Sequence, residues 1–335
     1  MGKIVTIKDV AKATGFSVTT VSRALNDFDD VKIATKELIK RTAQQMGYSP
    51  NILAKGLVGQ DTKTFGFITA NFSATTLMDN FSFKLYMGCL QVANESGYEV
   101  VLIHYSAKLY QGKTFAQIIN ERNLSGAIIQ GFDSDDPFCN AALESAIPTV
   151  FIDIGRQNKT SSYVMSDIAQ AAKTGLQLLI DRNYTHCCFM RGSLDAYVTR
   201  VWLEEVEKFV KKHRLDLPEF EIISGEYNQE SAYSNALQLM QQQPRINAFF
   251  CASDVMAIGV MKAADDLGRQ VPKSVAVLGF DNIAVAEYLS PALSTIMQYP
   301  DKIGGGAVSQ LLALQRGETV LPLLLNTDLV MRDSV

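Results

Sequence analysis

Short apolar runs alternate with amphipathic segments through most of the chain after residue 62. The apolar runs predict strands at 65–70, 98–105, 126–131, 148–153, 186–192, 220–225, 248–253 and 275–281. Segments of helical periodicity between them predict helices at 83–96, 167–182, 200–213, 229–243 and 254–267. Near-continuous apolar strands that alternate with helices indicate parallel, doubly wound α/β sheets with both faces covered. The segment is too long for one small α/β lobe, so we expect two lobes.

The pattern before residue 49 is different, because only helical periodicity occurs there. Thr6 can cap a first helix, Gly15 ends it, and Ser17 can cap a second helix over 18–26. The apolar positions predicted to face inward on these two helices are Ile7, Val10, Ala11, Val21, Ala24 and Leu25. Two short helices joined by a tight turn near a glycine indicate a helix-turn-helix.

A third helix is predicted over 33–46. Its start is weakly capped, since Lys32 stands where Ser or Thr would stabilise the helix better. The apolar residues predicted to close the small core from this helix are Leu38, Ile39, Ala43 and Met46. The N-terminal region is therefore predicted to be an all-α head. A plain three-helix bundle without a nucleic-acid partner is the alternative interpretation.

The charge is distributed unevenly along the chain. Residues 1–60 contain nine Lys and Arg against five Asp and Glu, whereas the whole chain has a net charge of −4. A basic head on an acidic body favours a polyanionic partner for the head.

The second predicted helix is the candidate DNA reader, because such a helix enters the major groove with its early residues at the base edges. Arg23 can pair bidentately with guanine, Thr19 can donate a hydrogen bond or touch a thymine methyl, and Val18 can pack. Hydroxyls and nearby backbone amides are expected to contact phosphates. The DNA contacts predicted in the head are Thr6, Ser17, Val18, Thr19, Thr20, Ser22, Arg23 and Asn26.

Two stretches, "TIKDVAKATGFSVTTVSRALN" and "GYSPNILAKGL", resemble the head and hinge of the LacI/GalR family of bacterial transcription regulators. In the hinge, Pro50 favours a helix start, and at most about two helical turns follow before Gly59. We expect this short helix to fold on DNA and to insert Leu57 between base steps of the minor groove. The predicted hinge contacts are Asn51, Leu53, Ala54, Lys55 and Leu57. A plain linker whose leucines pack on the body is the alternative.

Polar residues follow several of the predicted strands. In doubly wound sheets ligands bind beyond the carboxyl ends of the strands, so these residues are expected to line a cleft. They are Asp153, Ser253, Asp254, Asp281, Asn282 and Gln298. A helix-cap role is favoured for Asp254, which precedes an apolar helical segment, and ligand contact is favoured for Asp281.

The stretch "SDVMAIGVMKAADDLGRQVPKSVAVLGFDNIAVAEYLSPALSTI" and the terminal "LVMRDS" extend the resemblance to the family's two-lobed effector domain, which is built like periplasmic sugar-binding proteins. The resemblance implies a pocket arginine at Arg200, an aromatic platform at Tyr227 and an acceptor at Asp281. It implies further lining by Phe81, Asp153, Ser253 and Gln298. Carboxylates, an arginine and an aromatic ring suit a sugar-like effector. The sequence "VWLEEV" after Arg200 departs from the family pattern, and Trp202 is open to either a core or a pocket role.

The resemblance implies a homodimer that binds a pseudo-palindromic operator in double-stranded DNA under the control of a small-molecule effector. The predicted domains are a head at 1–48, a hinge at 49–61 and an effector-binding domain at 62–335. The lobe limits are predicted as 62–160 with 294–321 for the N-lobe, and 161–293 with 322–335 for the C-lobe. No heptad repeat for a tetramerising coiled coil follows Met331.

Other function classes lack their sequence signals. No G-x-S-x-G elbow, G-x-x-x-x-G-K-[ST] loop or G-x-G-x-x-G fingerprint occurs, and "IGGGAV" (303–308) is expected to begin a closely packed helix. The cysteines form no CxxC pair and are expected to be reduced and mostly buried, and the histidines lack metal-ligand spacing, so neither a metal nor a cofactor is expected. No long apolar run or signal core occurs, which predicts a cytoplasmic protein without membrane contact. A solute-binding receptor without DNA function is the alternative to a regulator.

Overall fold

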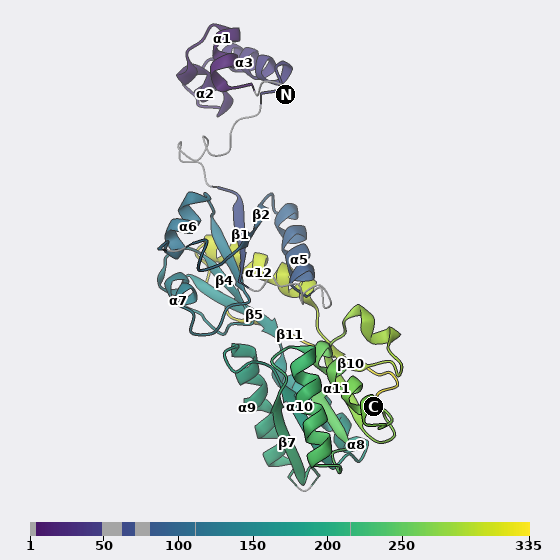
Figure 1. Ribbon diagram of the computed structural model, residues 1–335. Coiled ribbons are helices and arrows are strands. Elements are labelled where there is room, and N and C mark those ends of the chain that lie inside the picture. The colour runs from purple at the N-terminus through teal and green to yellow at the C-terminus, as the bar shows by residue number, and fades with distance from the viewer. Residues whose placement is uncertain (1–4, 49–61, 71–80, 111, 215) are drawn as a thin grey trace. The chain divides into compact units, whose positions relative to one another are not determined.

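The computed structural model describes residues 5–48, 62–70, 81–110, 112–214 and 216–335. The chain divides into two compact units, Met1–Thr62 and Lys63–Val335 (Figure 1). We call the described part of the first unit, residues 5–48, the helical head. Each unit has its own hydrophobic core, so each is described by itself.

The helical head consists of α1 (Ile7–Thr14), α2 (Val18–Leu25) and α3 (Ile33–Gln45). Both predicted caps are present. The backbone N–H of Thr6 donates to Asp9 Oδ2 at 2.9 Å, and the Thr20 N–H donates to Ser17 Oγ at 3.0 Å. Gly15 ends α1 with a φ of 74°, a conformation that costs glycine little. Lys32 precedes α3 and makes no side-chain cap hydrogen bond, as expected.

The core of the helical head agrees with the predicted pattern except at one position. The buried residues are Val10, Ala11, Val21, Ala24, Ile39 and Ala43, with Ile7, Leu25 and Met46 packed against them. The inward assignment of Leu38 is wrong, because its side chain is 45% exposed. Ile39, Ala43 and Met46 follow the i, i+4, i+7 spacing of one helix face, and a residue one position away points about 100° to the side.

The second unit contains two sheets, each with six strands among the described residues. The first sheet has the strand order β11-β5-β4-β3-β1-β2, and all of its pairings are parallel. Its strands are β1 (Thr64–Thr69), β2 (Glu99–His104), β3 (Gly126–Gln130), β4 (Thr149–Ile152), β5 (Ser161–Ser166) and β11 (Leu323–Leu325). We call this sheet and its helices the first lobe.

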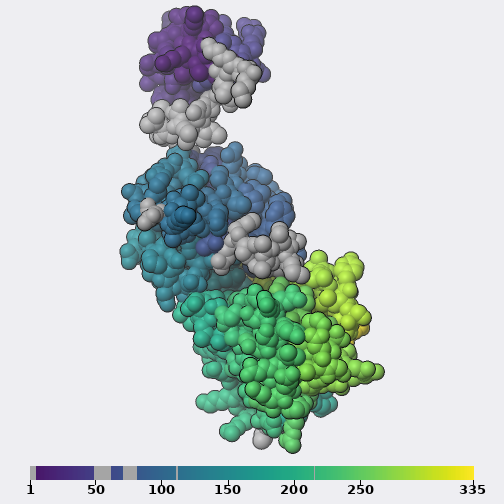
Figure 2. Space-filling model, in the orientation of Figure 1, coloured from purple at the N-terminus to yellow at the C-terminus, as the bar shows by residue number. Residues whose placement is uncertain are grey.

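The second sheet has the order β12-β10-β9-β8-β6-β7 and is parallel except for β12, which runs antiparallel to β10. Its strands are β6 (His186–Arg191), β7 (Glu219–Ser224), β8 (Ala248–Cys251), β9 (Ala276–Asp281), β10 (Ser294–Met297) and β12 (Asp328–Val330). We call this sheet and its helices the second lobe. Figure 2 shows the two lobes as adjoining masses, one blue to teal and the other green.

Helices cover the sheets on both faces, as parallel pairing requires. In the first lobe, Phe65 and Phe67 of β1 face α5 (Phe81–Glu95) and α12 (Pro300–Gln315), whereas Ile68 faces α6 (Phe115–Glu121) and α7 (Pro137–Glu144). The second lobe carries α8 (Ile168–Asp181), α9 (Tyr197–Lys212), α10 (Gln229–Gln242), α11 (Asp254–Asp266) and the 3₁₀ helix η3 (Ala284–Tyr288). The cysteines are all buried, as predicted.

The glycine-rich segment 303–308 lies inside α12, which confirms the expectation of a closely packed helix. A Cβ atom built on Gly304 would overlap the backbone oxygen of Leu85 in α5, and one on Gly88 would overlap the backbone of Asp301 in α12. The absence of side chains at these two positions therefore lets the backbones of α5 and α12 touch.

The predicted lobe limits need correction at all three crossings. β5, which begins at Ser161, and β11, which begins at Leu323, both belong to the first sheet, whereas β10 belongs to the second. The chain thus changes lobe after a strand has ended, near 167, 298 and 326. Strand β5 has the sequence "SSYVMS" and escaped prediction because its buried serines break the apolar run. The short strands β11 and β12 and the helices α6 and α7 were also not predicted, whereas β10 was expected, since Gln298 was predicted to follow a strand.

Candidate functional site

The predicted DNA contacts of the helical head divide into exposed and partly buried side chains. Thr6, Ser17, Val18 and Thr19 are exposed, and Val18 has 41% of its surface open although it is apolar. The others are partly buried: Thr20, Ser22, Arg23 and Asn26. The start of α2 therefore presents Val18 and Thr19 outward, which is the geometry that base-edge contact requires.

Arg23 forms an exposed ion pair within the helical head, which the sequence did not reveal. Its Nε is 2.8 Å from Oδ2 of Asp30, and its guanidinium carbon lies 4.4 Å from the centre of the Phe28 ring. The hydrogen bond from Arg23 lowers the pKa of Asp30 below its ordinary value. The pair uses Nε of Arg23, so a guanine edge would be read by the two Nη atoms, while Asp30 offsets the positive charge that they present to DNA. The predicted hinge contacts Asn51, Leu53, Ala54, Lys55 and Leu57 lie outside the described residues.

The second unit holds a cavity of about 950 Å³ that draws its lining from both lobes, and we call it the cleft. This volume suits a small organic ligand. The cleft brings together most of the predicted effector contacts: Phe81, Asp153, Tyr227, Ser253, Asp281 and Gln298. They come from the carboxyl ends of β4, β7, β8 and β9, from the start of α5 and from the crossing after β10. The strand-end rule predicted this convergence for Asp153, Ser253, Asp281 and Gln298, whereas Phe81 and Tyr227 were expected from the family resemblance.

Gln298 connects the two lobes at the cleft. Its Nε2 donates to Oδ1 of Asp281 at 2.5 Å, and its Oε1 accepts from the Ser166 hydroxyl at 2.9 Å. Ser166 ends β5 in the first sheet, whereas Asp281 ends β9 in the second. The amide of Gln298 is therefore hydrogen-bonded to the ends of both sheets. A movement of one sheet relative to the other, or a ligand that binds Asp281, would change these hydrogen bonds.

The helix-cap role favoured for Asp254 is wrong, because Ser253 is the N-cap of α11 and Asp254 is its first residue. The fully buried Asp254 carboxylate accepts from the Ile283 N–H at 2.9 Å and from the Thr295 hydroxyl at 2.6 Å. Burial raises the pKa of this carboxyl to about 7. Through these two hydrogen bonds, Asp254 fixes the backbone at Ile283, two residues after Asp281, and connects it to β10.

The backbone of the cleft is strained at four of its polar or aromatic residues. Asp153, Glu226, Tyr227 and Asp281 have φ values of 59°, 51°, 50° and 125°, which side-chain-bearing residues rarely adopt. Such conformations persist only where the surroundings enforce them. At Asp281 the enforcement includes the neighbouring Asn282, whose Oδ1 accepts from Arg332 Nη2 at 2.8 Å.

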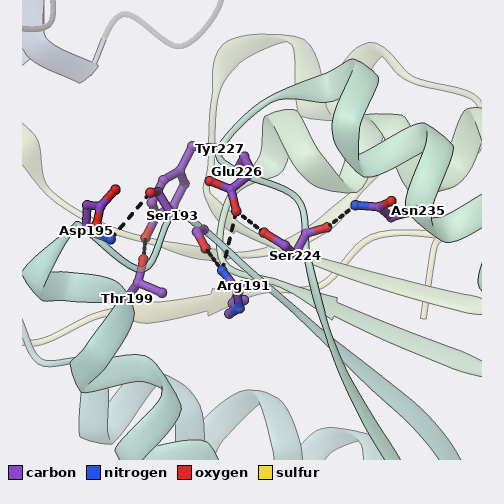
Figure 3. A network of polar contacts seen from close by, with 9 residues as sticks. Arg191, Ser193, Asp195, Thr199, Ser224, Glu226, Tyr227 and Asn235 are labelled. Carbon is purple, nitrogen blue, oxygen red and sulfur yellow. Dashed lines mark hydrogen bonds and ion pairs between the residues drawn. The ribbon is translucent and has the colours of Figure 1, made fainter.

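Tyr227 is held at its hydroxyl by Thr199 (Figure 3), and its ring packs on Gly192. Its hydroxyl lies 3.0 Å from the Thr199 hydroxyl, and a Cβ atom on Gly192 would overlap the ring. Burial raises the pKa of the Tyr227 hydroxyl well above its ordinary value, and the charges of Asp153 and Asp281 add to this effect. The predicted aromatic platform is therefore a neutral ring next to two carboxyl groups.

Asp153 has no hydrogen-bond partner for its carboxylate among the residues that the structure describes; its backbone N–H donates to Val164 at 3.1 Å. Burial raises the pKa of the Asp153 carboxyl to about 7. A carboxyl in this position at the edge of a cleft can bind a ligand group, and its desolvation makes a charged partner favourable.

Arg200 is the predicted effector contact that the cleft does not include. Its side chain is 46% exposed, and its Nη1 lies 3.7 Å from Oδ2 of Asp135 in the first lobe. Two residues further along α9, Trp202 lines the cleft instead. Residues two apart on a helix point about 200° from each other, so the same helix cannot send both side chains to one place.

Trp202 serves as core and as cleft lining at once. It is 1% exposed, and its ring centre lies 5.5, 5.4 and 5.1 Å from those of Phe189, Phe250 and Phe280. The sequence left these two roles open as alternatives. The further aromatic lining that the sequence did not reveal is Phe132, Tyr197, Tyr233 and Phe280. Tyr197 packs on Gly155, where a Cβ atom would overlap its ring.

A further polar contact joins the lobes beside the cleft. The N–H and the hydroxyl of Ser134 in the first lobe both donate to the backbone oxygen of Asp195 in the second, each at 3.1 Å. Arg156 donates to the backbone oxygen of Ser134 and, at 3.1 Å, to Asp135 Oδ1. These contacts describe a conformation in which the two lobes already touch.

Comparison with known proteins gives matches in both units. Residues 6–51 match the model for bacterial regulatory proteins of the lacI family, and residues 176–335 match a periplasmic binding protein-like domain. The chain is 30% identical over 336 residues to the HTH-type transcriptional regulator MalR of Clostridium butyricum, covering 98% of each chain. It is 29% identical to the HTH-type transcriptional repressor PurR of Klebsiella pneumoniae, covering 92% of this chain and 89% of the relative.

Solved structures share the fold over nearly the whole chain. A lac repressor dimer bound to operator and the anti-inducer ONPF has a TM-score of 0.81 at 24% identity, covering 99% of each chain. A CelR–cellobiose complex has a TM-score of 0.74 at 24% identity and covers 99% of this chain and 100% of that one. In the part of the chain that the structure describes, no helix is long and apolar enough to cross a membrane. The full-length similarity to MalR, together with the match of the helical head, shows that the chain is a transcriptional regulator of the lacI family.

Proposed function

We propose that this regulator is a repressor that binds a pseudo-palindromic operator as a homodimer and responds to a small sugar-like effector held in the cleft. The observation that carries the proposal is the convergence of six predicted effector contacts on one cavity of about 950 Å³. The match of the helical head to the lacI family supports the DNA-binding part of the proposal. Such a protein acts where the DNA is, which in a bacterium is the cytoplasm.

The proposed reading of DNA uses the exposed start of α2. Val18 and Thr19 are exposed there, and Arg23 lies one turn further along the same helix. Two heads in a dimer would contact two half-sites, which is why the operator is proposed to be pseudo-palindromic. One structural neighbour is a lac repressor dimer bound to operator, which supports this assembly by similarity.

A sugar-like effector fits the chemistry of the cleft. Asp153 and Asp281 offer oxygens for hydroxyl groups, and the neutral ring of Tyr227 offers a face for an apolar side of a sugar. Two structural neighbours are complexes with cellobiose and with lactose, which supports the same ligand class.

The proposed control acts through the three lobe crossings. Gln298 lies in one crossing and bonds to Asp281 of the second lobe and Ser166 of the first. Gln170 bonds to the backbone of Thr327 in another crossing, at 2.8 Å. A ligand that changes the angle between the sheets must therefore rearrange these contacts. Coupling free energies of this kind are typically about 1–3 kcal/mol.

An electrophoretic mobility shift with fragments of the upstream region of the protein's own gene tests the proposal. We expect retardation of a fragment that contains an inverted repeat, and a changed affinity when an effector is added. The sign of that change tells whether the effector is an inducer or a corepressor. Loss of all retardation with and without candidate ligands would favour a solute-binding receptor without DNA function.

A further inference from the structure

The described lining of the cleft is strongly acidic. Its carboxyl groups are Asp133, Asp153, Glu226, Glu230, Asp266 and Asp281. Among the described lining residues, the cationic side chain is Lys262, and its Nζ lies 2.5 Å from Asp266 and 3.8 Å from Asp265. That lysine is therefore already neutralised by its neighbours on α11.

The arginines near the cleft are also committed elsewhere. Arg200 and Arg156 both contact Asp135, and Arg191 donates to the Gly192 oxygen at 2.7 Å and lies 3.5 Å from Glu226 (Figure 3). Where the sequence led us to expect a pocket arginine, the cleft is lined by the apolar ring of Trp202.

Asp153 is the cleft carboxyl whose negative charge a bound ligand would balance. Within the described part of the chain its carboxylate has no hydrogen-bond partner, and it lines the same cleft as Tyr227, whose hydroxyl pKa its charge raises. Asp281 adds a second negative charge near the same hydroxyl. A desolvated carboxylate is costly unless a cation or several hydrogen bonds compensate it.

An aromatic wall completes this arrangement. Trp202, Phe280, Tyr227 and Tyr197 all line the cleft, and a cation over an aromatic face is stabilised by the ring quadrupole. We propose that the effector carries a protonated amine, as an amino sugar does, and that the cleft rejects sugar phosphates and other anions. The inference rests on the proposed effector role of the cleft and names the charge that this effector brings.

Trp202 provides the measurement, because it is the single tryptophan of the chain and lies in the cleft wall. The full chain is titrated near pH 8 with glucosamine, galactosamine and mannosamine, and with the N-acetyl, parent and 6-phosphate form of each sugar. We expect at least one amine to change Trp202 emission with an affinity tenfold or more above those of its three matched forms. The inference is overturned if the amines give no response, or if a parent sugar or a phosphate binds more tightly than its amine.

A pair of charge-neutralising variants locates the effect. We expect Asp153→Asn to reduce the affinity for the amine at least tenfold and to leave that for the N-acetyl sugar within about threefold. Asp181→Asn removes an exposed carboxylate outside the cleft lining and should change neither affinity. An unchanged amine preference in Asp153→Asn overturns the inference. Operator retardation by the same preparations is read separately, so a protein that shifts DNA but ignores amines refutes this inference and leaves the proposed DNA function standing.

Discussion

The carboxylate of Asp254 lies 2.6 Å from the hydroxyl of Thr295, which ties the first turn of α11 to β10 under the cleft. The other carboxylate oxygen holds the backbone of Ile283, two residues after Asp281. A Cβ atom on Gly279 of β9 would overlap Asp254 Oδ1, so α11, β9 and β10 meet at this one side chain.

Asp254→Ala should therefore both destabilise the second lobe and weaken effector binding. The substitution leaves the Thr295 hydroxyl and the Ile283 N–H buried without their acceptor, at a cost of about 1–3 kcal/mol for each group. Urea unfolding measures the stability, and Trp202 emission measures the binding. Asp265→Asn on the exposed side of the same helix is the control, and a loss of stability as small as that of the control would contradict this role of Asp254.

The pH dependence of stability should report Asp153. Its folded-state pKa of about 7 lies above the ordinary value of 3.8, so the folded protein binds the proton more tightly than the unfolded chain does. The associated stability is full below pH 3.8 and is lost as the pH rises through 7. Asp153→Asn should make unfolding less dependent on pH between about 5 and 8, with a gain at pH 8 of at most about 4 kcal/mol.

Thermal unfolding of the unmodified chain, Asp153→Asn and the control Asp181→Asn at pH 5 and pH 8 measures this effect. Asp254 also has a raised pKa, so part of the pH dependence should persist in Asp153→Asn. Equal pH dependence in all three proteins would show that Asp153 is not the desolvated group described above.

The ion pair between Arg23 and Asp30 predicts a competition at the DNA. Arg23→Ala should cost about 1–3 kcal/mol of operator affinity and relax the base preference at one position of each half-site. Asp30→Asn should tighten operator binding, since the positive charge of Arg23 is no longer offset by a paired carboxylate. Asp29→Asn changes the same amount of charge on the neighbouring residue and serves as the matched control.

Fluorescence anisotropy with operator and single-base variants measures these affinities. The pairing model requires a larger gain in Asp30→Asn than in Asp29→Asn, and it requires that difference to vanish when Arg23 is replaced by Ala. Identical gains in the two Asn variants would mean that only net charge matters.

Arg200 and Asp281 should differ sharply in their effect on the effector response. Asp281→Ala removes a cleft carboxylate and should abolish the response while operator binding persists. Arg200→Ala removes an exposed ion pair with Asp135, which is worth at most about 1 kcal/mol, so the effector affinity should change less than about fivefold. Effector titrations that follow operator release or retention measure the response of each variant. If Arg200→Ala lost as much of the effector response as Asp281→Ala does, Arg200 would have to contact the effector.

The strands that the sequence predicted are those with uninterrupted apolar runs, such as "AFFCAS" at β8 and "VAVLGFD" at β9. β5 was missed because Ser161, Ser162 and Ser166 are buried in it, and burial of hydroxyls depends on neighbours that a linear pattern does not show. The lobe limits were misplaced for the same reason, since a missed strand moves the apparent crossing.

The sequence correctly predicted the cleft residues at the ends of strands, but it did not show which side chains of the helix α9 line the cleft. Asp153 follows β4 and Asp281 ends β9, and parallel strands bring their carboxyl ends to one edge. Arg200 and Trp202 lie on α9, where a rotation of one or two residues decides which side chain enters the cleft. Cross-lobe contacts such as Ser134 with Asp195 carry no sequence signal, because they join a side chain to a distant backbone oxygen.

Because the chain crosses between the lobes three times, the parts of the molecule are completed in a fixed order during synthesis. The first lobe is incomplete until α12 and β11 have left the ribosome, because α12 buries one face of its sheet and β11 supplies its edge. At about 5–20 residues per second, the strands up to β5 wait roughly 10–30 s for these segments. The helical head buries its core within residues 5–48 and needs nothing that is made later. During each round of translation the proposed DNA reader is therefore complete well before the domain that would restrain it.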